Sequence, residues 1–167
     1  IDPDSRLFPN RIKQIKDKSG NTPKCFQDIR QALEDKDLDA VSVATCNHWH
    51  SLITIWACQA GKDVYGEKPL SYDIKEGQVL LKNLNKHKRI FQLGTQIHAG
   101  DNYHRVVEII QSGAIGKVHT VRLWKTGFSP GMGHPAKQTP PKTLNWDMWL
   151  GPAPYVDYMA ERCHLNY

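Results

Sequence analysis

The sequence predicts an α/β protein in which a parallel sheet with helices on both faces is followed by the start of a second α/β domain. Short apolar runs alternate with segments of helical periodicity between Asp37 and Lys125, which is the pattern of β-α-β units. The 167 residues are 40% hydrophobic, enough to bury one domain and part of another. Between Gly127 and Thr143 the composition shifts to Gly, Pro and basic residues, which indicates a long loop.

The first predicted elements are short and regularly spaced. Two helices come first, at 10–18 and 27–34. Three apolar strands follow, at 40–44, 63–66 and 90–94. The helix between the first two strands has apolar residues at helical spacing and stops before Gly61, in the manner of a C′ glycine. The helix after the second strand starts at Asp73, where Glu76 completes a pattern that resembles a capping box.

Two further elements are expected beyond the third strand. Tyr103, Val106, Val107 and Ile110 stripe one face of a helix that ends near Gly113. Residues 118–124 then alternate in polarity, which predicts a strand with one solvated face.

Composition argues against several classes of protein. The net charge of +5 equals the excess of five bases over acids between Ile109 and Trp146, and these bases are not interleaved with aromatic residues as in a nucleic-acid site. We therefore expect a solvated surface or one that attracts an anionic substrate, and no nucleic-acid partner. No apolar run reaches the roughly 20 residues of a membrane helix, so no membrane partner is expected. Four cysteines without a CxxC pair support neither a zinc ribbon nor a disulfide framework.

Polar side chains follow each predicted strand at its carboxyl end. They lie at 45–50, 67–69 and 95–98. Ligands of open parallel sheets bind at this edge, and right-handed crossovers place successive strands in one sheet. The three groups are therefore expected to share one rim.

Lys68 is the first candidate for acid–base chemistry. A lysine at a strand end, between Glu67 and Pro69, can be partly desolvated or lie beside a cation, and both effects favour a neutral amine. The alternative, a surface Glu–Lys pair worth well under about 1 kcal/mol, stays open on spacing alone. Pro69 also raises the possibility of a cis peptide at the rim.

Two other chemistries are not favoured at this rim. Cys46, His48 and His50 include residue types that bind zinc, but no fourth ligand has suitable spacing, so no metal is predicted. A Cys–His nucleophile is disfavoured because Cys46 has no orienting acid nearby in the sequence. The G-x-G-x-x-G turn that normally marks a dinucleotide domain is also absent.

The segment from Cys46 to Ser71, CNHWHSLITIWACQAGKDVYGEKPLS, closely resembles the Gfo/Idh/MocA family of NAD(P)-dependent oxidoreductases. The family has a strand ending in Thr-Pro-Asn-x-x-His, then a helix, A-G-K-x-V and E-K-P. Cys46 stands where the family usually has proline. The likeness continues through 94–96, 109–118 and 146–154. It implies a partial Rossmann dinucleotide-binding domain at 1–116 and the beginning of a C-terminal substrate and oligomerisation domain at 117–167.

The resemblance also implies the roles of individual residues. Lys68 would be the catalytic residue that transfers a proton at the substrate. NAD or NADP would be the cofactor, and its binding residues would be Thr45, Asn47, His50, Glu67, Lys68 and Gln96. Aromatic and guanidinium groups suited to sugar recognition lead toward the substrate domain, although core packing is the commoner role of tryptophans. These candidates are Trp146, Trp149, Tyr158 and Arg162.

By resemblance, the parent protein would move a hydride between nicotinamide and a secondary alcohol of a sugar or cyclitol. Its partners would be a small carbohydrate and further copies of itself. The alternatives are a redox-neutral glycoside-cleaving enzyme and a non-catalytic binding module. The family's Gly-rich turn and its Asp-x-Gly-x-His motif do not occur in this chain, so we expect an internal piece with weak NAD(H) affinity and no turnover. The location is open, with the cytoplasm favoured and export of the parent allowed.

Overall fold

The computed structural model describes residues 1–124, 127, 133 and 135–163. The described residues fall into two compact units. One unit consists of those in Ile1–Leu93 and Met132–Tyr167, and the other of those in Gly94–Gly131. The domain boundary expected after residue 116 stays a prediction.

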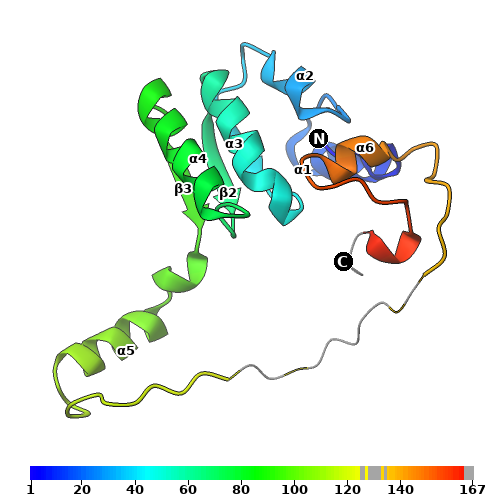
Figure 1. The fold of residues 1–167 in the computed structure, drawn as a ribbon. Coiled ribbons are helices and arrows are strands. Elements are labelled where there is room, and N and C mark those ends of the chain that lie inside the picture. The colour runs from blue at the N-terminus through cyan, green and yellow to red at the C-terminus, as the bar shows by residue number, and fades with distance from the viewer. Residues whose placement is uncertain (125–126, 128–132, 134, 164–167) are drawn as a thin grey trace. The chain divides into compact units, whose positions relative to one another are not determined.

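A parallel sheet runs through the first unit (Figure 1). Its strands are β1 (Ala40–Val43), β2 (Asp63–Glu67) and β3 (Phe91–Gly94), in the spatial order β1-β2-β3. β1 and β2 are parallel, and Val43 lies opposite Gly66. The three predicted strands are confirmed to within one residue at each end, and the predicted α/β fold class is confirmed with them.

Four α-helices belong to the sheet region. They are α1 (Phe8–Ser19), α2 (Ile29–Leu33), α3 (His50–Gln59) and α4 (Ile74–His87). The predicted start of α4 is confirmed, because the Asp73 carboxylate accepts a hydrogen bond from the Glu76 backbone N–H at 2.8 Å. The Glu76 carboxylate does not close a capping box and instead accepts from the Tyr72 backbone N–H and the Ser51 hydroxyl. Gly61 takes the positive φ of 77° expected after α3.

The first core lies around α3, which packs on β1 and β2 and against α4 (Figure 1). Crossovers of one hand place the two connecting helices of a β1-β2-β3 sheet on the same face. α3 has buried residues on most of its turns because it lies between strands and a helix. The buried apolar residues of this core are Ile29, Ala32, Leu33, Val43, Trp49, Ile53, Ala57 and Val64.

A second core surrounds α6 (Trp146–Leu150). The indoles of Trp146 and Trp149 stack with their centroids 4.8 Å apart, and Tyr158 meets Trp146 edge-on at 5.1 Å. The Trp146 indole N–H donates to the Val156 carbonyl at 2.9 Å, so its polar atom is satisfied within the core.

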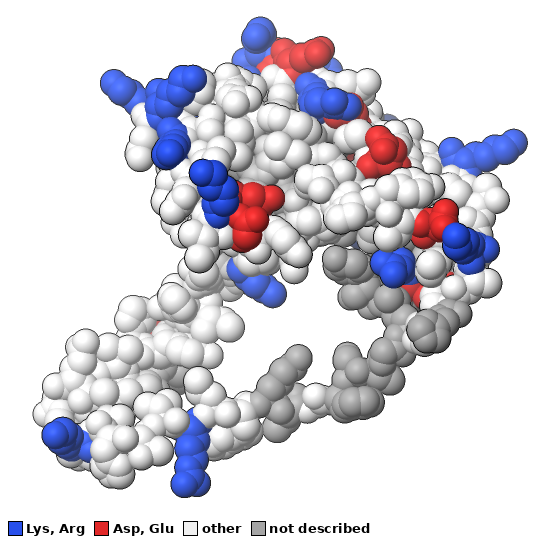
Figure 2. All heavy atoms as spheres, in the orientation of Figure 1, with Lys and Arg blue, Asp and Glu red and all other residues white. Residues whose placement is uncertain are grey.

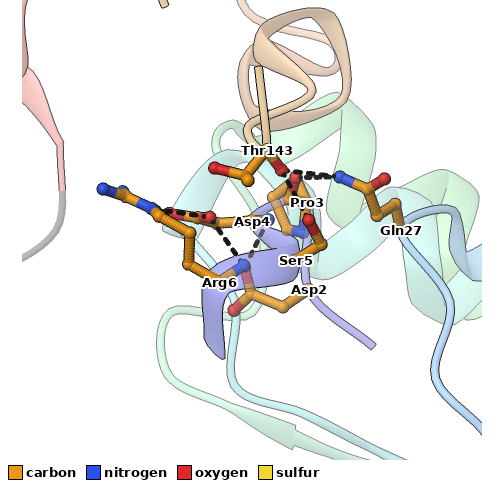
Figure 3. A network of polar contacts seen from close by, with 7 residues as sticks. All are labelled: Asp2, Pro3, Asp4, Ser5, Arg6, Gln27 and Thr143. Atoms are coloured by element: carbon orange, nitrogen blue, oxygen red, sulfur yellow. Dashed lines mark hydrogen bonds and ion pairs between the residues drawn. The ribbon is translucent and has the colours of Figure 1, made fainter. Parts of the chain in front are cut away.

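Residues 3–5, which pair with the chain around Leu144, connect this second core to the sheet region (Figure 3). The Ser5 N–H donates to the Thr143 carbonyl at 3.0 Å, and the Asn145 N–H donates to the Pro3 carbonyl at 2.9 Å. The Gln27 amide donates to both of these carbonyls, at 2.7 Å to Pro3 and 2.9 Å to Thr143. Three segments far apart in sequence are therefore joined at one point, which fixes the position of α6.

The second unit contains η3 (Gln96–Ala99) and α5 (Asp101–Gln111), and all residues from 101 to 124 are exposed. The helix predicted before Gly113 is confirmed. The strand predicted at 118–124 is wrong, because no other strand in the described chain supplies hydrogen bonds to these residues. The predicted loop at 127–143 lies partly outside the described residues, and 135–143 contain no helix or strand.

Basic and acidic side chains are interspersed on the face shown in Figure 2. Lys24, Arg30 and Lys137 each form an ion pair with an aspartate at 2.9 Å or less. Of the five bases that account for the net charge, Lys125 lies outside the described residues. In the described part of the chain, no helix has the length and apolar character that crossing a bilayer requires.

Candidate functional site

The carboxyl ends of β1 and β2 bring two of the predicted polar groups to one edge of the sheet. The pairing of Val43 with Gly66 places Thr45 and Lys68 each two residues beyond that level. The side chains of Thr45 and Lys68 are exposed, whereas Glu67 is half-buried. The Lys68–Pro69 peptide bond is cis. Two of the three segments expected at the rim therefore meet there.

His50 joins the two segments directly. It is the first residue of α3 and is only 3% exposed. Its Nδ1 lies 2.7 Å from the Pro69 carbonyl oxygen, and its Nε2 lies 3.1 Å from the Thr45 carbonyl oxygen. Both polar atoms of the imidazole therefore face backbone of this chain, and contact of His50 with a cofactor stays a prediction.

Asn47 projects from the turn between β1 and α3. It begins η2 (Asn47–Trp49), and within the described chain its carboxamide has no hydrogen-bond partner. Cys46 before it has φ −60° and ψ 145°, values that a proline adopts without strain. The cysteine therefore reproduces the backbone that the family's usual proline would set. Asn47 is exposed and free to bind a ligand.

The turn that carries Asn47 contacts the second core. The sequence did not predict this contact. The Trp49 indole N–H donates to the Met148 carbonyl at 3.0 Å, and the His48 Nε2 lies 3.2 Å from the Trp149 carbonyl oxygen. Gly151 ends α6 with φ 52°, and a Cβ there would overlap the Trp49 ring. The positive φ explains why position 151 is a glycine. Trp49, which it contacts, lies about 100 positions earlier, so the sequence around either residue does not predict the contact.

An open groove of about 1190 Å³ runs along β1. Phe26 and Ile29 line its apolar part, and Thr45 and Asn47 line its polar end. Exposed hydroxyl and amide groups at that end suit the ribose hydroxyls and carboxamide of a nicotinamide nucleotide, which both donate and accept hydrogen bonds. The residues present therefore fit the nicotinamide end of the predicted cofactor.

The other predicted site residues lie elsewhere. Gln96 is exposed at the start of η3, in the second unit. Trp146, Trp149 and Tyr158 are each at most 8% exposed and form the second core, which is the alternative role considered for the tryptophans. Arg162 is half-buried. Their contact with substrate stays a prediction.

The structure gives no support to a thiol nucleophile or a metal centre at this edge. Burial raises the pKa of the Cys46 thiol, which therefore stays protonated at neutral pH and is a poor nucleophile. The imidazoles of His48 and His50 contact backbone carbonyls. Within residues 1–124 and the described positions beyond, His, Cys, Asp and Glu form no cluster of three that could hold a metal ion.

Two family models match this chain. The model described as an oxidoreductase family with an NAD-binding Rossmann fold matches residues 8–95. The model described as the C-terminal α/β domain of an oxidoreductase family matches residues 100–167.

Several curated relatives are dehydrogenases. The myo-inositol 2-dehydrogenase of Thermotoga maritima is 30% identical over 126 residues, which are 75% of this chain and 37% of that protein. The levoglucosan dehydrogenase of Pseudarthrobacter phenanthrenivorans is 33% identical over 101 residues, 57% of this chain and 24% of that protein. This chain thus spans little more than a third of the length of the first of these relatives.

Solved structures show the same fold. The myo-inositol 2-dehydrogenase of Lactobacillus plantarum has a TM-score of 0.58 and 28% identity, covering 67% of this chain and 33% of that chain. The apo scyllo-inositol dehydrogenase of Lactobacillus casei has a TM-score of 0.55 and 28% identity, covering 65% of this chain and 32% of that chain.

Proposed function

This chain belongs to the Gfo/Idh/MocA family of NAD-binding oxidoreductases, and on that premise we propose that the protein carrying it oxidises a secondary alcohol of a cyclitol. Support for a cyclitol comes from the inositol dehydrogenases among its relatives. The levoglucosan dehydrogenase keeps a sugar alcohol as the second candidate. Assembly of the protein into a homo-oligomer stays a prediction.

One observation supports this function most directly: the segments carrying Asn47 and Lys68 are held together at the carboxyl edge of β1 and β2. In our proposal Thr45, Asn47 and Glu67 bind the nicotinamide and its ribose. The cofactor contact that the resemblance implies for Gln96 stays a prediction. The cofactor, when bound, supplies the hydride acceptor. Lys68 takes the proton of the substrate hydroxyl, for which its exposed amine is suitably placed beyond the end of β2.

Substitution of Lys68 tests this role in the full-length protein. We expect Lys68→Met to lower kcat by about 10²–10⁴, the usual contribution of a general acid–base group. Lys68→Arg should be similarly slow, because a guanidinium stays protonated at working pH and cannot take a proton from the substrate. Lys75→Met, on the exposed surface of α4, is the matched control and should leave kcat unchanged. A Lys68→Met enzyme with normal kcat and a raised KM would contradict the proton-transfer role.

The product balance separates this proposal from the two alternatives. A dehydrogenase accumulates one NADH for each alcohol oxidised, measured by absorbance in the nicotinamide band. A redox-neutral glycoside-cleaving enzyme releases sugar without net NADH, and a binding module changes neither quantity. The named dehydrogenases among the relatives favour the first outcome.

A further inference from the structure

We infer that His50 is a positioning residue, which holds the Asn47 turn and the Lys68 segment in register through its two ring nitrogens. The inference rests on the proposed function of Lys68 and departs from the cofactor contact expected for His50. Nothing else in the described chain joins these two segments side chain to backbone in this way.

The first support is the geometry of the ring. Carbonyl oxygens only accept hydrogen bonds, and the Nδ1 and Nε2 atoms of His50 lie 2.7 Å and 3.1 Å from two of them. One oxygen belongs to Thr45, two residues before Asn47, and the other to Pro69, directly after Lys68. In either tautomer the ring donates from one nitrogen and places the other within contact distance of the second carbonyl, so the ring sets the spacing between the two segments.

The second support is that the ring itself is fixed. His50 is 3% exposed, its backbone N–H bonds to the Asn47 carbonyl, and its own carbonyl accepts from the Thr54 hydroxyl at 2.8 Å. α3 in turn packs on both strands. The buried helix α3 therefore fixes the imidazole, and the imidazole in turn contacts two exposed segments.

The third support is that His50 presents no free polar atom to a ligand. Its two ring nitrogens both contact backbone, whereas Asn47 and Lys68 are exposed. A cofactor contact through His50 would displace one of these two carbonyl contacts. We therefore assign ligand contact to the exposed neighbours and alignment to His50.

Steady-state kinetics of the full-length protein distinguish an alignment role of His50 from a role in cofactor binding. His50→Phe keeps a flat ring but has no donor, and we expect kcat at saturating cofactor to fall by about 10–100-fold, the usual effect of a misplaced catalytic group. The Kd of NADH should change little. His50→Gln retains an N–H donor for one carbonyl and should recover part of the loss. A weakened NADH complex with normal kcat at saturation would overturn the inference and return His50 to the cofactor site.

A double-mutant cycle tests whether His50 acts through Lys68. If it does, adding His50→Phe to Lys68→Met should lower kcat no further, because the group being aligned is already gone. Additive losses would show that His50 acts independently and would overturn the inference. A Lys68→Met enzyme with normal kcat would instead overturn the proposed function. The contacts of His50 with the Thr45 and Pro69 carbonyls would then be tested by proton exchange alone.

Exchange of the ring proton with water tests the two carbonyl contacts of His50 without an activity assay. In nitrogen-15 NMR spectra of this chain, the ring N–H proton of His50 should exchange slowly with water, because the ring is buried and its nitrogens lie against carbonyl oxygens. The exposed His104 in α5 is the matched control, and its ring protons should exchange rapidly. Equally rapid exchange at both histidines would overturn the inference, even if His50→Phe fails to fold.

Discussion

Helix α4 in the first unit and helix α5 in the second both carry an apolar stripe, but only one of them is buried. Leu80 of α4 is completely buried, whereas Val107 and Ile110 of α5 are 49% and 46% exposed. α4 packs against α3, whereas the element that α5 contacts most in the described chain is the short η3, and it does so far less extensively. Apolar periodicity is therefore sufficient to predict a helix, but burial and its stabilisation require a partner surface.

The same contrast explains the strands. β1 and β2 are hydrogen-bonded to each other, whereas residues 118–124 alternate in polarity without forming a strand. A strand is defined by its neighbour because its backbone groups are satisfied only across the ladder. Four experiments can sharpen or break this contrast between a packed and an unpacked region.

The largest effect is expected where the second core meets the Asn47 turn. Gly151→Ala would place a methyl group in the space of the Trp49 indole, at a backbone φ that disfavours a side chain. Overpacking and backbone strain together should lower the free energy of unfolding by about 2–6 kcal/mol. The urea midpoint of the purified chain measures the change. An unchanged midpoint would show that the Trp49 contact contributes nothing to the packed region.

The next test compares neighbouring leucines of α4. Leu80→Ala removes a fully buried side chain and should destabilise the chain by about 2–5 kcal/mol. Leu81→Ala, at a position 54% exposed, should change stability by less than about 0.5 kcal/mol. Both values come from urea unfolding at one temperature. Equal losses at the two positions would contradict the packing described for α4.

A smaller, pH-dependent effect is expected at the start of α2. The hydrogen-bonded Arg30 guanidinium lowers the pKa of Asp28 below its ordinary value of 3.8. Because the folded pKa is the lower one, the stabilisation is present at neutral pH and is lost as the pH falls from about 4 through the folded pKa.

Asp28→Asn isolates this charge, because asparagine is also a good N-cap residue. The ion pair is partly exposed, so the variant should be less stable by under about 1 kcal/mol at pH 7. Unfolding curves of both proteins between pH 7 and pH 2 should converge at the acid end. A difference that grows toward low pH would have the wrong sign for this pair.

The smallest effect is expected in α5. Ile110→Ala removes a side chain that is 46% exposed and should change the free energy of unfolding of the first unit by no more than about 0.5 kcal/mol. Backbone amides of 101–111 should also exchange with solvent faster than those of β2 and α3. Strong protection of α5 would show that its apolar face is covered and would remove the contrast.

Local signals in the sequence predict much of the fold because they act over a few residues. The Asp73 cap, the glycine after α3 and the apolar run of β1 each depend on neighbouring atoms alone, and each is confirmed. The rim is partly predictable because consecutive strands of β-α-β units usually lie side by side in one sheet, as β1 and β2 do here. Residues 118–124 were predicted wrongly because their pattern does not reveal whether another strand is available.

The sequence by itself determined the strands, most helix boundaries and the polar residues Asn47 and Lys68 at the strand ends, because periodicity, capping and turn chemistry act over short range. Only the tertiary structure decided that His50 bridges the Thr45 and Pro69 carbonyls and that Trp49 rests on Gly151. Those contacts join residues 5 to about 100 positions apart. Their partners are selected by packing geometry, which no local pattern encodes.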